Sequence, residues 1–205
     1  MKNAQQRAIT SDAQQPAMAS DAQRPRIINV FFVGNALMGD DGVALALYKF
    51  TRKNYRCSPG VFLHDVGCMS MDMLSYVQQS DVIITIDALD NTQAHAGSVF
   101  QYTCDEMARV QGTRTSLHVM RLPDLFDAAH LLGYTAKGIC LGVQIAPGAA
   151  SRVHVGLSKK VEEALPLLWN TLAAQLAQLN APFIDARTGE SVYSNVPVRL
   201  DPLQL

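Results

Sequence analysis

Short apolar runs alternate with longer segments of helical spacing along most of the chain. The runs are rich in Val, Ile, Leu and Phe, which is typical of strands buried on both faces of a parallel sheet. One run, "GSVFQYT", alternates apolar and polar residues instead, so it is predicted to be an edge or antiparallel strand. The predicted strands lie within residues 26–34, 60–67, 81–89, 97–103 and 138–146.

The segments between these runs place apolar residues on one helical face. In residues 41–53, Val43, Leu47 and Phe50 recur at helical spacing, and basic residues close the segment, as favoured at a helix C-terminus. Ser158 stands where the N-cap of the longest helix is expected. The predicted helices lie within residues 41–53, 70–80, 117–134 and 158–179.

This alternation predicts a three-layer α/β fold. A mostly parallel, twisted sheet of about five strands carries helices on both faces. The length of 205 residues suits one domain with one core, which we assign to residues 26–180. Residues 1–25 are rich in Ala, Gln, Ser and Asp and are predicted to be a disordered N-terminal tail. Residues 181–205 are polar and contain prolines, so a C-terminal loop or tail is predicted there.

The net charge, the apolar runs and the cysteines limit the possible partners and the cellular location. The net charge of −1 gives no reason to expect a nucleic acid or an anionic membrane surface as partner. No apolar run has the length of a membrane span, and the N-terminus lacks the pattern of a secretory signal. The four cysteines form no CxxC pair, which favours reduced thiols. We therefore expect a cytoplasmic protein without membrane insertion.

Acidic residues follow the predicted strands. The first strand leads to Asp40 and Asp41, the second reaches Asp65, and the third ends at Asp87. Parallel strands bring their carboxyl ends to one edge of the sheet, where α/β folds bind ligands. Carboxylates gathered there repel one another unless a cation or a proton lies between them. This predicts a metal site, and an added imidazole would favour a first-row transition metal.

Each of these acids also has an ordinary structural interpretation. A single Asp after a strand is more typical of a helix N-cap or a turn than of a ligand. The doublet is harder to explain in this way, because one cap needs one carboxylate. Asp40 could cap the following helix while Asp41 points elsewhere.

Other candidate chemistries are weaker. His118 lies just ahead of a predicted helix, where a loop could carry it to the sheet edge, whereas His95 and His130 are expected to be solvated or packed. "VGNALMGDDG" lacks the GxGxxG spacing and puts acids where phosphates would bind, which disfavours a dinucleotide site. The chain contains no GxSxG elbow, while Cys68 stays open as a nucleophile.

A set of motifs in a fixed order resembles a known family. "VGNALMGDDGVA", "DVG", "IDALD", "SLHVMRLPDLF", "GVQIAPG" and "LSKKVEEALPLL" are similar, in this order, to landmarks of the nickel-iron hydrogenase maturation endopeptidases. The similarity runs from about residue 28 to about residue 178.

The resemblance implies a hydrolase that acts on a protein substrate. Members of this family remove a C-terminal peptide from the nickel-loaded large-subunit precursor of a hydrogenase, and the nickel belongs to the substrate. The family's metal-contacting positions fall on Asp41, Asp87 and His118, and Asp65 with Gly67 matches a further landmark near the cleft. Asp41 or Asp65 could act as general base, or the metal could activate the water.

Two other functions remain open from the sequence. One is a non-catalytic maturation chaperone or scaffold that holds the nickel-containing precursor through the same residues. The other is a metallohydrolase with a small substrate, which would bind its metal tightly in the isolated protein.

Overall fold

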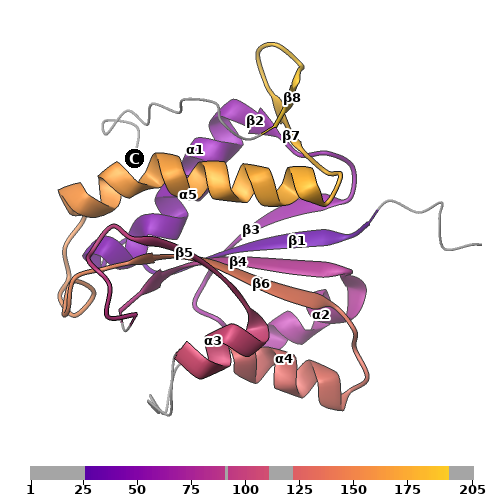
Figure 1. Cartoon of the computed structure of the whole chain (residues 1–205), viewed down its shortest axis with the longest axis horizontal. Coiled ribbons are helices and arrows are strands. Elements are labelled where there is room, and N and C mark those ends of the chain that lie inside the picture. Colours follow the sequence, from indigo (N-terminus) through magenta and orange to yellow (C-terminus); the bar gives the residue numbers. More distant parts are fainter. Residues whose placement is uncertain (1–25, 91, 111–121, 194–205) are drawn as a thin grey trace, which may run out of the picture.

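The computed structural model describes residues 26–90, 92–110 and 122–193, and the predicted tail over residues 1–25 lies outside them. Figure 1 shows three layers with a sheet in the middle. Helices α1 (Val43–Asn54) and α5 (Lys159–Gln178) cover one face. Helices α2 (Leu74–Gln79), α3 (Cys104–Val110) and α4 (Leu122–Leu131) cover the other. The predicted three-layer α/β fold is therefore confirmed.

The central sheet has five strands in the order β3-β1-β4-β6-β5. Four of them pair in parallel, and β5 pairs antiparallel with β6 at one edge, which confirms the prediction made from its alternating pattern. The strands are β1 (Ile28–Val33), β3 (Val61–Gly67), β4 (Val82–Leu89), β5 (Val99–Thr103) and β6 (Lys137–Gln144).

The connections reverse direction between β1 and β4. From β1 the chain passes through α1 to β3 on one side of β1, and then through α2 to β4 on the other side. The loop after β1 leads to α1, and the loop after β4 leads to β5 at the far edge of the sheet, so the two loops diverge at this point (Figure 1). Such a switch point leaves room for a ligand beyond the carboxyl ends of the two strands.

The sheet separates two hydrophobic clusters. Val30 and Phe32 of β1 face the cluster under α1 and α5, whereas Phe31 and Val33 face the cluster under α2, α3 and α4. All six residues of β1 are buried, which explains its unbroken apolar run. A rigid central strand therefore supports the start of the loop that contains Asp41.

The C-terminal segment corrects the prediction of a loop or tail over residues 181–205. Strands β7 (Phe183–Asp185) and β8 (Ser191–Val192) form a hairpin, and β7 also pairs with β2 (Tyr55–Arg56) in a second small sheet. Phe183 is buried and stacks on Trp169 with ring centroids 6.1 Å apart. A few apolar side chains thus anchor a segment whose overall composition is polar. Residues 194–205 lie outside the described part.

Two helical segments differ from their predicted bounds. The described part of the helix predicted over residues 117–134 begins at Leu122, with Pro123 in its first turn. Proline is tolerated there because the N–H groups of the first turn have no acceptor within the helix. Helix α3 was not predicted, because its short sequence "CDEMARV" has little periodicity. Short 3-10 turns, Gly39–Gly42 and Met71–Met73, precede α1 and α2.

Candidate metal-binding and catalytic site

The loop after β1 is folded tightly around Asp41. Gly34 has φ of +135°, and a Cβ atom added there would lie 2.0 Å from the backbone oxygen of Asp41. Only glycine permits this approach. The Asn35 N–H donates to Asp41 Oδ2 at 2.7 Å, and the Leu37 N–H donates to Asn35 Oδ1 at 3.0 Å. These bonds fix the Asp41 carboxylate beside the end of β1.

Asp40 has a structural role in the same loop. It is 3% exposed, and its Oδ1 and Oδ2 atoms accept the N–H of Ser158 at 2.6 Å and the Ser158 hydroxyl at 2.9 Å. The prediction that Asp40 caps α1 is therefore wrong, and the N-cap residue of α1 is Gly42. Ser158 is the N-cap residue of α5, as predicted, but its hydroxyl bonds Asp40. Asp40 thus joins the loop to the start of α5.

Asp87 lies near the end of β4, in register with Gly142 of β6. Its Oδ1 atom accepts the Ala88 N–H at 2.8 Å. Burial raises the pKa of Asp87 to about 8 against the effect of that hydrogen bond, and the charges of Asp41 and Asp90 raise it further. Burial also raises the pKa of Asp41, and the hydrogen bond from Asn35 opposes this rise. Strand β4 also contacts the turn Gly39–Gly42, so Asp41 and Asp87 lie close enough for their charges to interact.

The third predicted ligand, His118, lies outside the described residues. Among the residues that are described, no group of three or more His, Cys, Asp or Glu side chains could hold a metal ion. The structure thus brings two of the predicted ligands together, and the complete set stays a prediction. Two neighbouring carboxylates that are partly or fully shielded from water repel each other, and a cation bound between them could take the place of a proton.

Asp65 lies at the same edge of the sheet in a different setting. It is exposed at the end of β3 and in register with Phe32, so strand alternation places it on the Phe32 face. Asp87 lies two residues after Thr85, which is in register with Phe31 and belongs to the other face. The role of Asp65 as a base therefore stays a prediction.

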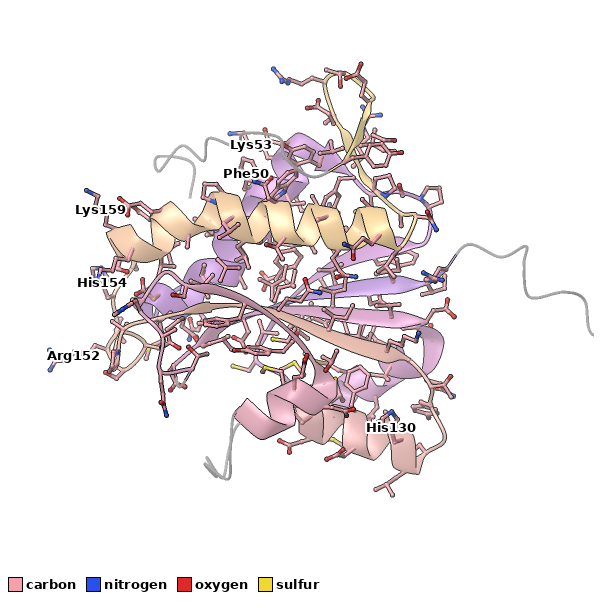
Figure 2. All side chains as sticks on the ribbon, in the orientation of Figure 1. Phe50, Lys53, His130, Arg152, His154 and Lys159 are labelled. Atoms are coloured by element: carbon pink, nitrogen blue, oxygen red, sulfur yellow. The ribbon has the colours of Figure 1, made fainter. Side chains whose placement is uncertain are left out.

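The other described histidines have different surroundings. His64 Nε2 is 2.6 Å from Asn29 Oδ1, and its ring contacts Phe31 and Tyr76. His95 and His130 are exposed, and Figure 2 shows His130 on α4, far from the carboxyl ends of the parallel strands.

Two cysteines are poor candidates for a nucleophile. Burial, with nearby negative charges, raises the pKa of Cys104 and of Cys140 to about 12, so both thiols are protonated at neutral pH. Cys68 is exposed just after β3, so burial gives no reason to exclude it as a nucleophile.

Gln144 is a buried polar residue beside the candidate site that the sequence did not single out. It is buried at the end of β6, and its Oε1 atom accepts the N–H of Thr92 at 3.0 Å and the Thr92 hydroxyl at 2.5 Å. Its Nε2 group donates to the Ile145 carbonyl at 2.6 Å. Gln144 thereby fixes the loop that follows Asp87. The signal for it was a lone amide inside the apolar run "GICLGVQIA".

The comparison with protein families identifies the chain. Residues 46–175 match the family described as hydrogenase maturation protease. The chain belongs to this family. The resemblance predicted from the motifs is thereby confirmed.

Individual relatives agree with this assignment. The chain is 32% identical over 119 residues to the hydrogenase expression/formation protein HupM of Azotobacter chroococcum, covering 57% of this chain and 56% of HupM. It is 26% identical over 148 residues to the hydrogenase 2 maturation protease of Escherichia coli, covering 72% of this chain and 89% of that protein. The chain therefore spans little more than half of the first relative.

Solved structures share the fold. The hydrogenase maturating endopeptidase HybD from E. coli aligns with a TM-score of 0.70 at 23% identity, over 78% of this chain and 98% of HybD. A hydrogenase maturation protease HybD from Thermococcus kodakarensis aligns with a TM-score of 0.53 at 19% identity, over 74% and 99%. In the described part of this chain, no helix combines the length and apolar character that crossing a bilayer requires.

Proposed function

We propose that this protein is an endopeptidase that removes a C-terminal peptide from the nickel-loaded large-subunit precursor of a nickel-iron hydrogenase. The observation that carries the proposal is the pairing of Asp41 and Asp87 at the switch point of the sheet. Both carboxylates have raised pKa values, so each is poorly stabilised as a free anion there. A cation brought by the substrate would stabilise the charged forms.

Nickel enters this proposal as part of the substrate. Two carboxylates and the imidazole of His118 would supply oxygen and nitrogen ligands, which bind nickel less strongly than the thiolates of a metal centre hold it. Such a site detects a metal in the precursor without removing it. The cytoplasmic location and the absence of a nucleic-acid partner remain expectations from the sequence.

Binding through the metal would position the scissile peptide bond. Contact of the precursor's nickel with Asp41, Asp87 and His118 would hold the scissile peptide bond near the carboxylates. Binding of the substrate would then also position the reacting groups. The nickel would polarise the carbonyl group or acidify a water molecule. Asp41 or the exposed Asp65 would take the proton from the attacking water.

The test is the mass of the large-subunit precursor before and after incubation with the purified protein, with and without nickel. The proposal expects a shortened product only from the nickel-loaded precursor. A stable complex without a shortened product would instead support the chaperone function. Tight metal binding by the isolated protein, with an uncut precursor, would support a metallohydrolase with another substrate.

A further inference from the structure

A short extended segment borders the loop that contains Asp41. Residues 153–155 lie beside residues 37–39, and Met38 and His154 form a parallel bridge. The His154 N–H donates to the Leu37 carbonyl at 2.9 Å, and its carbonyl accepts the Gly39 N–H at 2.7 Å. The bonds of Asp40 to Ser158 fix the end of this segment as well. Its position relative to the candidate site is therefore well defined.

The outer edge of this segment is open. In an extended chain the residues on either side of a bonded residue direct their N–H and carbonyl groups to the opposite side. Within the described part of the chain, the backbone groups of Val153 and Val155 have no backbone hydrogen-bond partner. An open edge of this kind can accept an added strand from another polypeptide.

Apolar side chains surround the open edge. Val153 is 80% exposed, Val155 is 73% exposed and Leu37, on the neighbouring loop, is 57% exposed. Scattered exposed apolar residues are ordinary, but these belong to two paired segments beside the candidate site. Figure 2 shows Arg152, His154 and Lys159 at this same end of the molecule, beyond the carboxyl ends of the parallel strands.

We infer that the extended C-terminal segment of the precursor adds as a strand to residues 153–155. This inference rests on the proposed function. Backbone hydrogen bonds to Val153 and Val155 would hold the segment, and apolar side chains of the precursor would cover these valines and Leu37. Because this edge is tied to the Asp41 loop, a chain lying along it is led to Asp41 and Asp87. Arg152 would attract the carboxylate at the end of the precursor chain.

The first test uses the full-length protein and nickel-loaded precursor. Val153→Asp combined with Val155→Asp should lower kcat/KM for processing by about tenfold or more, mainly through KM, because apolar burial is lost. Leu131→Asp is the matched control, since Leu131 is 89% exposed on α4, away from the site. It should process within about twofold of the wild type. Equal processing by the double variant and the control would overturn the inference.

A second pair of variants tests the backbone contact itself. Val155→Pro removes the outward N–H and leaves both bonds of His154 in place, whereas Val155→Thr keeps the N–H and the side-chain shape. Processing should fall further in the proline variant than in the threonine variant. Equal processing by the proline and threonine variants would contradict strand addition. If the proline variant has a lowered melting temperature, the comparison of the double aspartate variant with Leu131→Asp decides.

An uncut precursor with the wild-type protein would contradict the proposed function, whereas normal cutting by all variants would contradict only this inference.

Discussion

Asp40 and Asp41 are neighbours in the chain with different surroundings. Asp40 is buried and accepts two hydrogen bonds from Ser158, while Asp41 accepts one from Asn35 and interacts with Asp87. The sequence indicated that one carboxylate of the doublet would be free for the site. It could not show which residue binds the other, because Ser158 is 118 positions away from Asp40 and hydrophobic periodicity says nothing about such a contact.

Replacing Asp40 should lower stability through the contact with α5. Asp40→Ala leaves the Ser158 N–H and hydroxyl without their acceptor, so the free energy of unfolding should fall by about 1–3 kcal/mol. Asp41→Asn should leave this free energy nearly unchanged, because a carboxylate disfavoured by burial becomes neutral. Urea denaturation of both variants compares them directly. Equal stability of Asp40→Ala and the wild type would contradict the structural role of Asp40.

Asp87 should make the protein less stable as the pH rises. Its pKa is about 8 in the folded protein against an ordinary value of 3.8, so the folded state keeps a proton that the unfolded state has lost. The stability contributed by the protonated form is complete below about pH 4 and is lost as pH rises towards about 8, with a slope of at most about 1.4 kcal/mol per pH unit. Asp87→Asn should remove this slope. Denaturation curves recorded from about pH 5 to about pH 8 check this, and parallel pH dependence in both proteins would refute it.

At the scale of elements, the turn after β1 sets the position of the candidate site. Strands β1 and β4 were predictable because all residues of β1 and most of β4 are buried between two layers of helices. Strands β7 and β8 were not predictable, since three and two residues are too few to show a period. The position of β7 depends on contacts of Phe183 with Trp169 of α5 and with Tyr55, which lies much earlier in the chain.

Gly34 should be essential to that turn. Gly34→Ala places a methyl group against the backbone oxygen of Asp41 and holds alanine at a φ of +135°, so stability and processing should both fall. Gly133→Ala is the matched control, because Gly133 also has a positive φ, of +80°, and an added Cβ there has nothing within 4 Å. Melting temperatures and processing rates of both variants test this. Similar losses in the two variants would mean that backbone strain alone, and not the contact with Asp41, accounts for the effect.

At the scale of the whole molecule, the switch point of the sheet brings distant residues together. Asp41 follows β1 and Asp87 lies near the end of the neighbouring strand β4, and the loops after these strands diverge because one leads to α1 and the other to β5. The alternation of strands and helices made this arrangement predictable, and the order of the strands confirms it. The contribution of His118 was inferred from the family resemblance alone, and it lies outside the described residues.

The most direct measurement of the central claim is the mass of a nickel-loaded large-subunit precursor after incubation with single variants of this protein. Asp41→Asn, Asp87→Asn and His118→Ala should each leave the precursor at full length, while folding like the wild type. His130→Ala, which changes an exposed histidine on α4, should yield the same shortened product as the wild type. A shortened product from the Asp41 or Asp87 variant at the wild-type rate would contradict the claim that these two carboxylates form the site.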